Sequence, residues 1–514
     1  MRVPDLECAW VLLSPCASPR SNHTLRTVPP HQSRSYAEGH DASMWHCLLR
    51  LLGRDARAAT EEPTSPLAAT QQGPCSSEDA ATGLAHPSAD AAQAASPAID
   101  RAMRIAQLPL RMGGLGLRSA VRNAPAAWWA SWADALGLLH ARHPQFAQTV
   151  CLELERGPAA PSDCLRSVHE AMATLTAEGA QCPSWRELLA GVRAPDRGTA
   201  PSEPGEWCHG WQYAAATRRE NHFRDRALLP SLDDHSAALL QSQSGLLSGR
   251  AFGLLPTAPE TTFTPERMRV LLARRLRLEL PLAPRRCSCG RALDALGDHR
   301  AACSTSGRLG PRGFPLEKAA ARVCREAGAR VQENVFLRDL NLPGVSVADG
   351  RRLEVVANGL PLFHGKQLAV DTSLVSPLTR NGTARSDDAL LTARGRKETT
   401  YPELLTGGRC RLVVLALEVG GRWSQEAATF VWDLAAARSR SAPSTLRKAT
   451  AQAYYRRWTG LLAYAAANAL AASLLEEPLA GTANVDGPEP EFTWVLTEAR
   501  CEEGPDFSRL PLRA

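Results

Sequence analysis

The spacing of apolar and polar positions changes twice along this 514-residue chain. The first hundred residues are rich in Ala, Ser, Pro and His and show no sustained period. Stretches such as residues 61–98 bury too little apolar surface to offset the entropy lost on ordering. The pattern therefore predicts that residues 1–100 are a disordered, low-complexity leader.

Helical periodicity begins near residue 101 and continues to about residue 285. A first segment, residues 98–120, is interrupted at Pro109 and by three closely spaced glycines. A second segment, residues 125–141, carries three tryptophans on its apolar face. We expect one unit over residues 101–140 and an all-α linker region over residues 141–285.

The pattern becomes α/β between residues 306 and 480. A helix over residues 314–328 precedes four Val- and Leu-rich segments bounded by Gly or Pro, which predict strands. A helix starting at Ser386 is expected after the third strand, with Asp387 and Asp388 in its first turn. A long helical segment closes the domain, and residues 481–514 form a tail without a clear period. The fold class predicted is multi-domain, with a mixed sheet in the α/β core. The four strand segments are residues 329–337, 351–359, 366–377 and 410–421.

Cysteine usage and hydropathy indicate a reducing compartment, the nucleus or the cytoplasm. The fourteen cysteines are spread along the chain and do not resemble a small secreted disulfide scaffold. Asp5 and Glu7 stand where a signal peptide has basic residues. No stretch reaches the eighteen or so apolar residues of a membrane span. We expect a protein that is not secreted and has no membrane partner.

Positive charge is concentrated in one segment, although the net charge of the chain is only +6. From Arg267 to Arg312 there are eleven arginines and three acidic residues. Such a stripe is typical of a surface that binds phosphates, and the alternative is a solvated helix face. We expect DNA as partner, with RNA as the alternative, and no small-molecule cofactor. The arginines predicted to contact nucleic acid are Arg267, Arg269, Arg274, Arg275, Arg277, Arg285 and Arg286.

A cysteine and histidine cluster lies within this basic segment. Cys287, Cys289, His299 and Cys303 follow the spacing C-x-C-x9-H-x3-C. Three thiolates and an imidazole are the ligands that a structural zinc ion prefers, so the spacing predicts a Zn²⁺ module over residues 286–305. Four full ligands leave no open position for catalysis. The alternative is a set of reduced cysteines in a loop.

An acidic residue interrupts the third predicted strand. Asp371 emerges in the middle of the apolar run 368–375, and Glu354 lies on the preceding strand. Two antiparallel strands would bring both carboxylates together, and such a pair needs a cation such as Mg²⁺. With Lys397 on the following helix, the set would suit phosphodiester cleavage. The alternative places Glu354 in a surface hairpin and pairs Asp371 with Arg351 or Arg352.

The ordered motifs together resemble one family. "LPLRMGGLGLRSA" followed by "APAAWWASWADAL" resembles the segment just after the polymerase domain of non-LTR retrotransposon reverse transcriptases. In the site-specific branch of those elements, a Cys-Cys-His-Cys cluster and a restriction-enzyme-like endonuclease follow in this order. The resemblance covers about residues 100–480. It implies that residues 101–140 are a post-polymerase, thumb-like remnant and that residues 306–480 are a restriction-endonuclease-like domain.

The resemblance also implies roles for individual residues. Glu354 and Asp371 would hold a catalytic Mg²⁺ or Mn²⁺, and Lys397 and Tyr401 match the family's lysine and tyrosine. Glu354 stands where the family has an aspartate, which changes the reach of this ligand. Residues implied as auxiliary are Glu333, Asp349 and Glu418.

A polymerase domain has no counterpart in the sequence, because a Tyr/Phe-x-Asp-Asp hairpin is missing. The chain is therefore expected to be a C-terminal fragment of a retroelement polyprotein and not a reverse transcriptase. The activity expected is metal-dependent nicking of DNA. The alternatives are a catalytically inactive remnant that binds DNA or RNA and a decayed fragment without activity.

Overall fold

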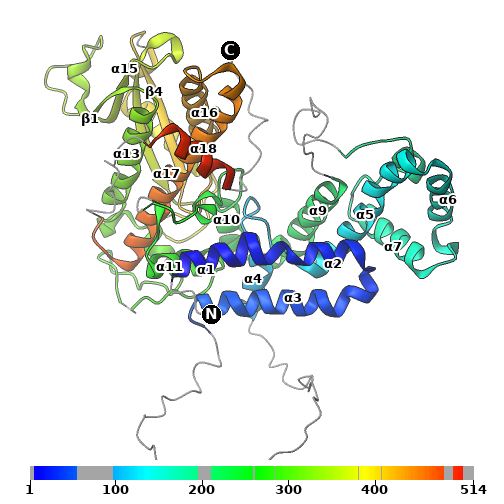
Figure 1. The fold of residues 1–514 in the computed structure, drawn as a ribbon. Coiled ribbons are helices and arrows are strands. Elements are labelled where there is room, and N and C mark those ends of the chain that lie inside the picture. The colour runs from blue at the N-terminus through cyan, green and yellow to red at the C-terminus, as the bar shows by residue number, and fades with distance from the viewer. Residues whose placement is uncertain are drawn as a thin grey trace, which may run out of the picture.

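The chain is mostly helical and contains one four-stranded mixed sheet. The structure is a computed structural model and describes residues 5–54, 97–194, 210–258, 261–283, 285–379, 381–406, 408–479 and 490–501. Figure 1 shows the strands in one part of the molecule and a group of helices, α5, α6, α7 and α9, in another.

The expected disorder of the leader is wrong for residues 5–54, which form helices α1 (Leu6–Val11), α2 (Ser21–Thr27) and α3 (Pro30–Leu51). Trp10 is almost completely buried, and its indole Nε1 donates a hydrogen bond to the carbonyl of Phe252 at 2.8 Å. Glu7 accepts a hydrogen bond from the backbone N–H of Phe263 at 2.8 Å. These segments are ordered because they pack on a core supplied by distant residues. Residues 55–96 of the predicted leader lie outside the described residues.

Two cores organise the helical half. One is built on tryptophans of α5 (Ala120–Arg142), α8 (Trp185–Leu189) and α9 (Trp211–His222), with α6 (Pro144–Glu155) and α7 (Asp163–Ala177) around them. The other joins α1 and α3 to α4 (Pro97–Ala106), α11 (Pro265–Arg275) and the end of α17 (Arg447–Leu475). The second core crosses the predicted boundaries at residues 100, 140 and 285.

The glycines at residues 113–116 permit a close backbone approach. A Cβ on Gly114 would lie 2.1 Å from the carbonyl oxygen of Leu108, and Gly113 has a φ of +93° with Leu240 beside it. Neither position accepts a side chain without movement of the backbone. This turn stacks the end of α4 against α10 (Asp234–Ser242).

The four predicted strands are confirmed and form the order β1-β2-β3-β4. They are β1 (Arg330–Phe336), β2 (Arg352–Asn358), β3 (Gln367–Val375) and β4 (Cys410–Glu418). β1 and β3 pair antiparallel with β2, and β3 pairs parallel with β4. The connection from β3 to β4 contains α14 (Ala389–Thr400) and α15 (Glu403–Thr406). α14 begins three residues later than predicted, because the Asp388 side chain accepts the N–H of Leu390 and acts as the N-cap.

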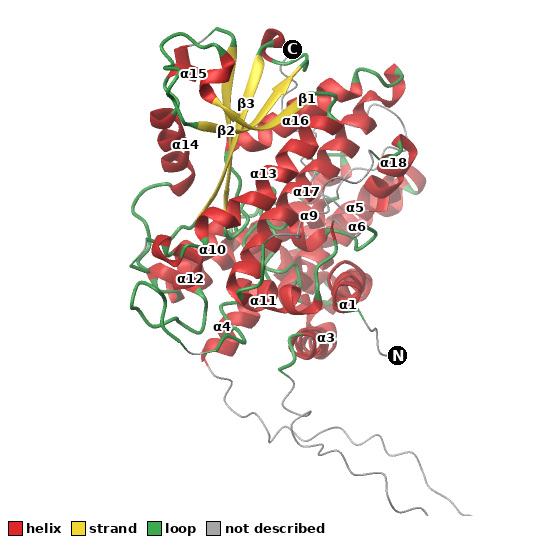
Figure 2. Ribbon diagram, turned by 90° about the vertical axis from the view of Figure 1, so that its left-hand side faces the viewer, coloured by secondary structure: helices red, strands yellow, loops and turns green. Residues whose placement is uncertain are grey.

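Helices cover both faces of the sheet (Figure 2). α13 (Leu309–Glu326), α16 (Gln425–Ser439) and α17 lie on one face, where Leu368 and Val370 join their core. α14 lies on the other face, where Ala369 packs with Leu390 and Ala393. The strand therefore alternates as its sequence predicts, and this alternation places Asp371 on the α14 face.

The segment Ser444–Leu475, which contains α17, is long and apolar enough to cross a membrane by length and composition. This corrects the expectation that no stretch reaches that length. In the structure, 89% of its most apolar window is buried inside the protein, as in the core helix of a globular domain.

Candidate metal centre and acidic site

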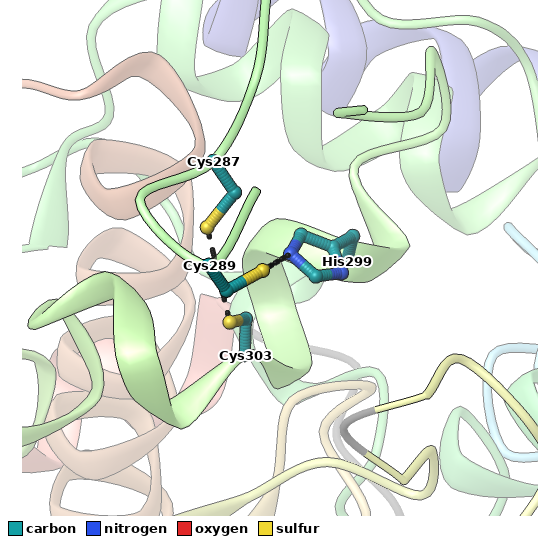
Figure 3. A group of neighbouring side chains, drawn as sticks. All are labelled: Cys287, Cys289, His299 and Cys303. Atoms are coloured by element: carbon teal, nitrogen blue, oxygen red, sulfur yellow. Dashed lines mark hydrogen bonds between the residues drawn. The ribbon is translucent and has the colours of Figure 1, made fainter. Parts of the chain in front are cut away.

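The four residues of the Cys/His cluster converge from one loop and one short helix (Figure 3). Their ligand atoms all lie within 4.8 Å of one another. The sulfurs of Cys287 and Cys303 are 3.8 Å apart, and the sulfur of Cys289 is 3.2 Å from Nε2 of His299. Around a tetrahedral zinc ion with Zn–S bonds of about 2.3 Å, two sulfurs lie about 3.8 Å apart. The cluster can therefore hold a metal ion, with donors that fit structural zinc.

Local hydrogen bonds explain how this sequence forms the cluster. The N–H of Cys287 donates to the carbonyl of Arg291, and Gly290, with a φ of +88°, closes the turn between Cys289 and Arg291. The Asp294 carboxylate accepts the N–H groups of Asp298 and His299 at 2.9 and 2.7 Å. Asp294 thereby fixes the start of α12 (Asp298–Ala302), the helix that presents His299.

Two thiols of the cluster differ in acidity before any metal binds. A hydrogen bond from the backbone N–H of Cys289 lowers the pKa of Cys287 to about 6. Burial raises the pKa of Cys303 above its ordinary value. Since zinc binds thiolates, the ion would enter with Cys287 already deprotonated near neutral pH, and Cys303 would release its proton on binding.

The predicted nucleic-acid contacts of Arg274, Arg275 and Arg277 are wrong, because all three side chains are buried. Arg274 and Arg277 pair with Asp298, which is 4% exposed, at 3.1 and 2.9 Å. A guanidinium enclosed in this way cannot reach a phosphate outside the protein.

Arg275 binds backbone carbonyls in place of an external partner. Its guanidinium donates to five carbonyl oxygens at 2.8–3.4 Å and joins segments that are far apart in sequence. One of these carbonyls belongs to Gly114 and another to Gly420. Arg275 thus links the glycine turn after α4 to the loop after β4. The five acceptors are Leu110, Gly114, Gln243, Ser248 and Gly420.

The remaining four arginines of the predicted stripe have intramolecular partners. Arg267 pairs with Glu477 at 2.6 Å, and Arg285 pairs with Glu476. Arg269 donates to the carbonyl of Leu51, and Arg286 donates to that of Gly290. Arg267, Arg269 and Arg285 therefore join this segment to neighbouring elements, whereas the bond of Arg286 stays within the zinc loop.

The acidic site is built where β2 and β3 separate. The pairing between the two strands ends at Val355 and Val370. Beyond this point the carboxylate of Glu354, and not a backbone carbonyl of β2, accepts hydrogen bonds from β3. Its Oε2 atom accepts the backbone N–H and the hydroxyl of Thr372 at 2.5 and 2.7 Å. This insertion brings Glu354 beside Asp371, which is completely buried. The predicted antiparallel pairing of the two acid-bearing strands is confirmed.

Lys397 and Tyr401 reach the same point from the end of α14. The Lys397 ammonium contacts Asp371 and lies 3.5 Å from Oε1 of Glu354. The Tyr401 hydroxyl donates to the carbonyl of Arg352 at 2.6 Å, which holds the beginning of β2. The alternative pairing of Asp371 with Arg351 is not seen, because Arg351 pairs with Asp349 and Glu403.

Burial and close charges perturb the acid–base behaviour of the site. Burial, reinforced by the charge of Asp371, raises the pKa of Glu354 to about 8. Burial alone would lower the pKa of Lys397, but the charges of Asp371 and Glu354 outweigh it and raise that pKa. Burial, with the charges of both carboxylates, also raises the pKa of Tyr401. Glu354 is therefore largely protonated at neutral pH unless a further cation is bound.

The three auxiliary acids do not join this group. Glu333 pairs with Lys318 at 2.6 Å and with Arg325. Asp349 pairs with Arg351, and Glu418 pairs with Arg422 at 2.7 Å. Sequence reasoning missed Glu317 of α13, whose pKa is raised by burial and by the charge of Asp371. Little in the sequence pointed to Glu317 as a site residue, since a single acid on an amphipathic helix is usually solvated.

The chain matches no protein-family model, and no curated protein sequence matches it.

Proposed function

We propose that the chain is a metal-dependent endonuclease that nicks DNA and carries a zinc-stabilised module. The observation that supports this most is the convergence of Glu354, Asp371 and Lys397 from β2, β3 and α14. Two carboxylates beside a lysine are a suitable set for phosphodiester cleavage.

The donor set fits a divalent cation. Both carboxylate oxygens of Asp371 are buried and, apart from the Lys397 contact, have no hydrogen-bond partner among the described residues. Burial, and then the charge of Asp371, raise the pKa of Glu354, and a cation bound between the two carboxylates would oppose this shift. Glu354 and Asp371 would hold Mg²⁺ or Mn²⁺, which would stabilise the negative charge that develops at the phosphate.

The protein's own groups have separate tasks in this proposal. Lys397 would orient a phosphate oxygen or a water molecule with its ammonium, which stays protonated because its pKa is raised. Tyr401 would hold the backbone of Arg352 and thereby the position of Glu354 two residues later. Thr372 fixes one oxygen of Glu354 and leaves the other toward Lys397.

A pair of exposed cations lies beside the site and suits a nucleic-acid backbone. The guanidinium carbons of Arg338 and Arg352 lie 4.1 and 4.0 Å from the ring centre of Phe336. Both guanidiniums are therefore within cation–π distance of the same ring. Arg352 is two residues from Glu354, about 7 Å of strand. Asp339, 3.8 Å from Arg338, balances part of this charge.

A retroelement origin is part of the proposal and rests on the order of the motifs. The glycine turn, the Cys-Cys-His-Cys cluster and the α/β domain follow one another as in the site-specific non-LTR elements. A second candidate is an inactive remnant that binds DNA or RNA. It is favoured by the contact of Lys397 with Asp371, in which an ammonium already supplies a cation to the buried acid.

Nicking of supercoiled plasmid by the full-length protein tests the proposal. The assay uses Mg²⁺ or Mn²⁺ and compares wild type, Asp371→Asn and Asp163→Asn, a charge-matched control at an exposed position of α7. The endonuclease requires nicking by wild type and by the control, with a loss of about 100-fold or more in Asp371→Asn. Salt-sensitive DNA binding without nicking would support the inactive remnant. Equal nicking by Asp371→Asn would refute the assigned site.

A further inference from the structure

The zinc loop is attached to the rest of the fold on several sides. Arg285 and Arg300 pair with Glu476 at the end of α17. Asp298, the first residue of α12, pairs with Arg274 and Arg277 of the α11 region and lies 3.1 Å from Nε2 of His235. The cluster is therefore an integrated part of the core and not a separate finger.

One attachment reaches the segment that connects the two halves of the acidic site. The Arg291 guanidinium, on the turn between Cys289 and Asp294, donates to the backbone carbonyl of Asn381 at 3.1 Å and to its side-chain oxygen at 3.0 Å. Asn381 lies between β3, which carries Asp371, and α14, which carries Lys397. Arg291 thus bonds twice to the same residue of this connection.

The connection itself is a small hairpin that presents Asn381 at its tip. Leu378 and Ala384 form a bridge, and the N–H of Thr379 donates to the carbonyl of Thr383 at 2.8 Å. A tip held at one residue transmits its position to both strands of such a hairpin. Displacement of Asn381 would therefore move the end of β3 and the start of α14 together.

Buried contacts support the same link. Ala302 of α12 packs with Leu378 and with Leu239 in a small apolar cluster. Arg312 of α13 is 1% exposed and donates to the carbonyl of Ala301 at 2.9 Å and to that of Leu374 in β3 at 3.5 Å. The short helix that supplies His299 is thereby joined to the end of the strand that carries Asp371.

We propose that Arg291 and Asn381 are positioning residues, through which the folded zinc cluster holds the connection between Asp371 and Lys397 in place. The proposal rests on the endonuclease function for its effect on catalysis, but the coupling itself does not depend on that function. Zinc would act here through the loop it orders, since the four ligands leave no position for substrate.

Hydrogen–deuterium exchange of residues 376–388 in the full-length protein tests the coupling. Arg291→Ala and Asn381→Ala are compared with Asn381→Asp, which keeps a side-chain oxygen for Arg291. Zinc content is measured for each. With one zinc per chain retained, we expect both alanine variants to exchange about three- to tenfold faster and Asn381→Asp to resemble wild type. The double alanine variant should exchange no faster than either single variant.

Removal of zinc from the wild-type protein by a chelator is a second test of the coupling. It should accelerate exchange in residues 376–388 at least as much as Asn381→Ala does. Unchanged exchange in this segment, either in Asn381→Ala or after zinc removal, would overturn the coupling.

The kinetics of nicking provide an independent test of the positioning role. In a protein that nicks DNA, Asn381→Ala should lower kcat more than it raises KM, and Asn381→Asp should restore kcat. Faster exchange with unchanged kcat would overturn the positioning role. A wild-type protein that does not nick would refute the proposed function, and the exchange data would still decide whether the coupling exists.

Discussion

The ammonium of Lys397 contacts the carboxylate of Asp371, a residue with no exposed surface. The lysine thus reaches a completely buried acid, and a second acid, Glu354, lies beside the pair. This contact is the centre of the acidic site, and its chemistry leads to the first two predictions.

Replacement of Lys397 by methionine should remove nicking but retain metal binding. Methionine preserves most of the side-chain volume and removes the charge, so Glu354 and Asp371 are left free to bind the cation. We expect kcat to fall about 100-fold or more and Mn²⁺ affinity to stay equal or increase. Titration calorimetry with Mn²⁺, beside the plasmid assay, measures both quantities. A parallel loss of metal binding would assign Lys397 a purely structural role.

Stability without added Mg²⁺ or Mn²⁺ should decrease between about pH 5 and pH 8. The folded-state pKa of Glu354 is raised to about 8, so the folded protein binds more protons than the unfolded chain in that range. As the pH rises through this range, Glu354 loses its proton in the folded protein, and the free energy of unfolding falls by an amount of the order of 2 kcal/mol or more. Urea titrations at a series of pH values measure this slope. Glu354→Gln should flatten it, and a metal ion that binds the carboxylates should oppose it.

Loss of one zinc ligand should destabilise the whole chain. Cys289→Ala removes a ligand from the cluster, and the loop that Arg285 and Arg291 anchor loses its organising ion. We expect less than one zinc per chain and a Tm lower by about 5 °C or more. Cys47→Ala, at an exposed position of α3, is the matched control and should keep both values. Metal analysis and calorimetry give the readout, and an unchanged Tm in Cys289→Ala would contradict a structural zinc site.

Asp298→Asn should be among the most destabilising single changes in the protein. It leaves Arg274 and Arg277 buried without their carboxylate partner. Breaking a buried ion pair in this way costs about 3–5 kcal/mol. Asp163→Asn breaks an exposed pair with Arg166 and should change stability little. Denaturant unfolding of the two variants compares these cases directly.

Arg352→Ala should weaken DNA binding, whereas the loss of Arg275 should act through folding. Arg352 is exposed beside the acidic site, and Arg275 is 2% exposed. We expect Arg352→Ala to reduce the salt dependence of binding by about one counterion with little change in Tm. Arg275→Met should lower Tm and leave the affinity of the folded fraction unchanged. Fluorescence anisotropy at several salt concentrations distinguishes the two effects.

The strands and the metal cluster could be predicted because each depends on local sequence. Alternation around Asp371 placed it on one face of β3, and the spacing of Cys287, Cys289, His299 and Cys303 brought four ligands together. The partners of the arginines could not be predicted in the same way. A count of charges between Arg267 and Arg312 does not show that Asp298 pairs with two of them. Nor does it show that Arg275 binds carbonyls from three segments of the chain.

The leader was misjudged for a related reason. Its apolar residues are too sparse to suggest a core of their own, and those of residues 5–54 that are buried in apolar clusters pack with later parts of the chain. Trp10 and Glu7 are ordered by Phe252 and Phe263, which no local pattern connects to them.

This closure between the start and the middle of the chain has a consequence during synthesis. The hydrogen bond from Trp10 to Phe252 joins residues 242 positions apart. At about 5–20 residues per second, the ribosome makes Phe252 about 12–50 s after Trp10. The helices of residues 5–54 therefore leave the ribosome well before their packing partners exist. Their apolar faces stay uncovered on the nascent chain during that interval, which slower translation lengthens, and uncovered apolar surface promotes aggregation.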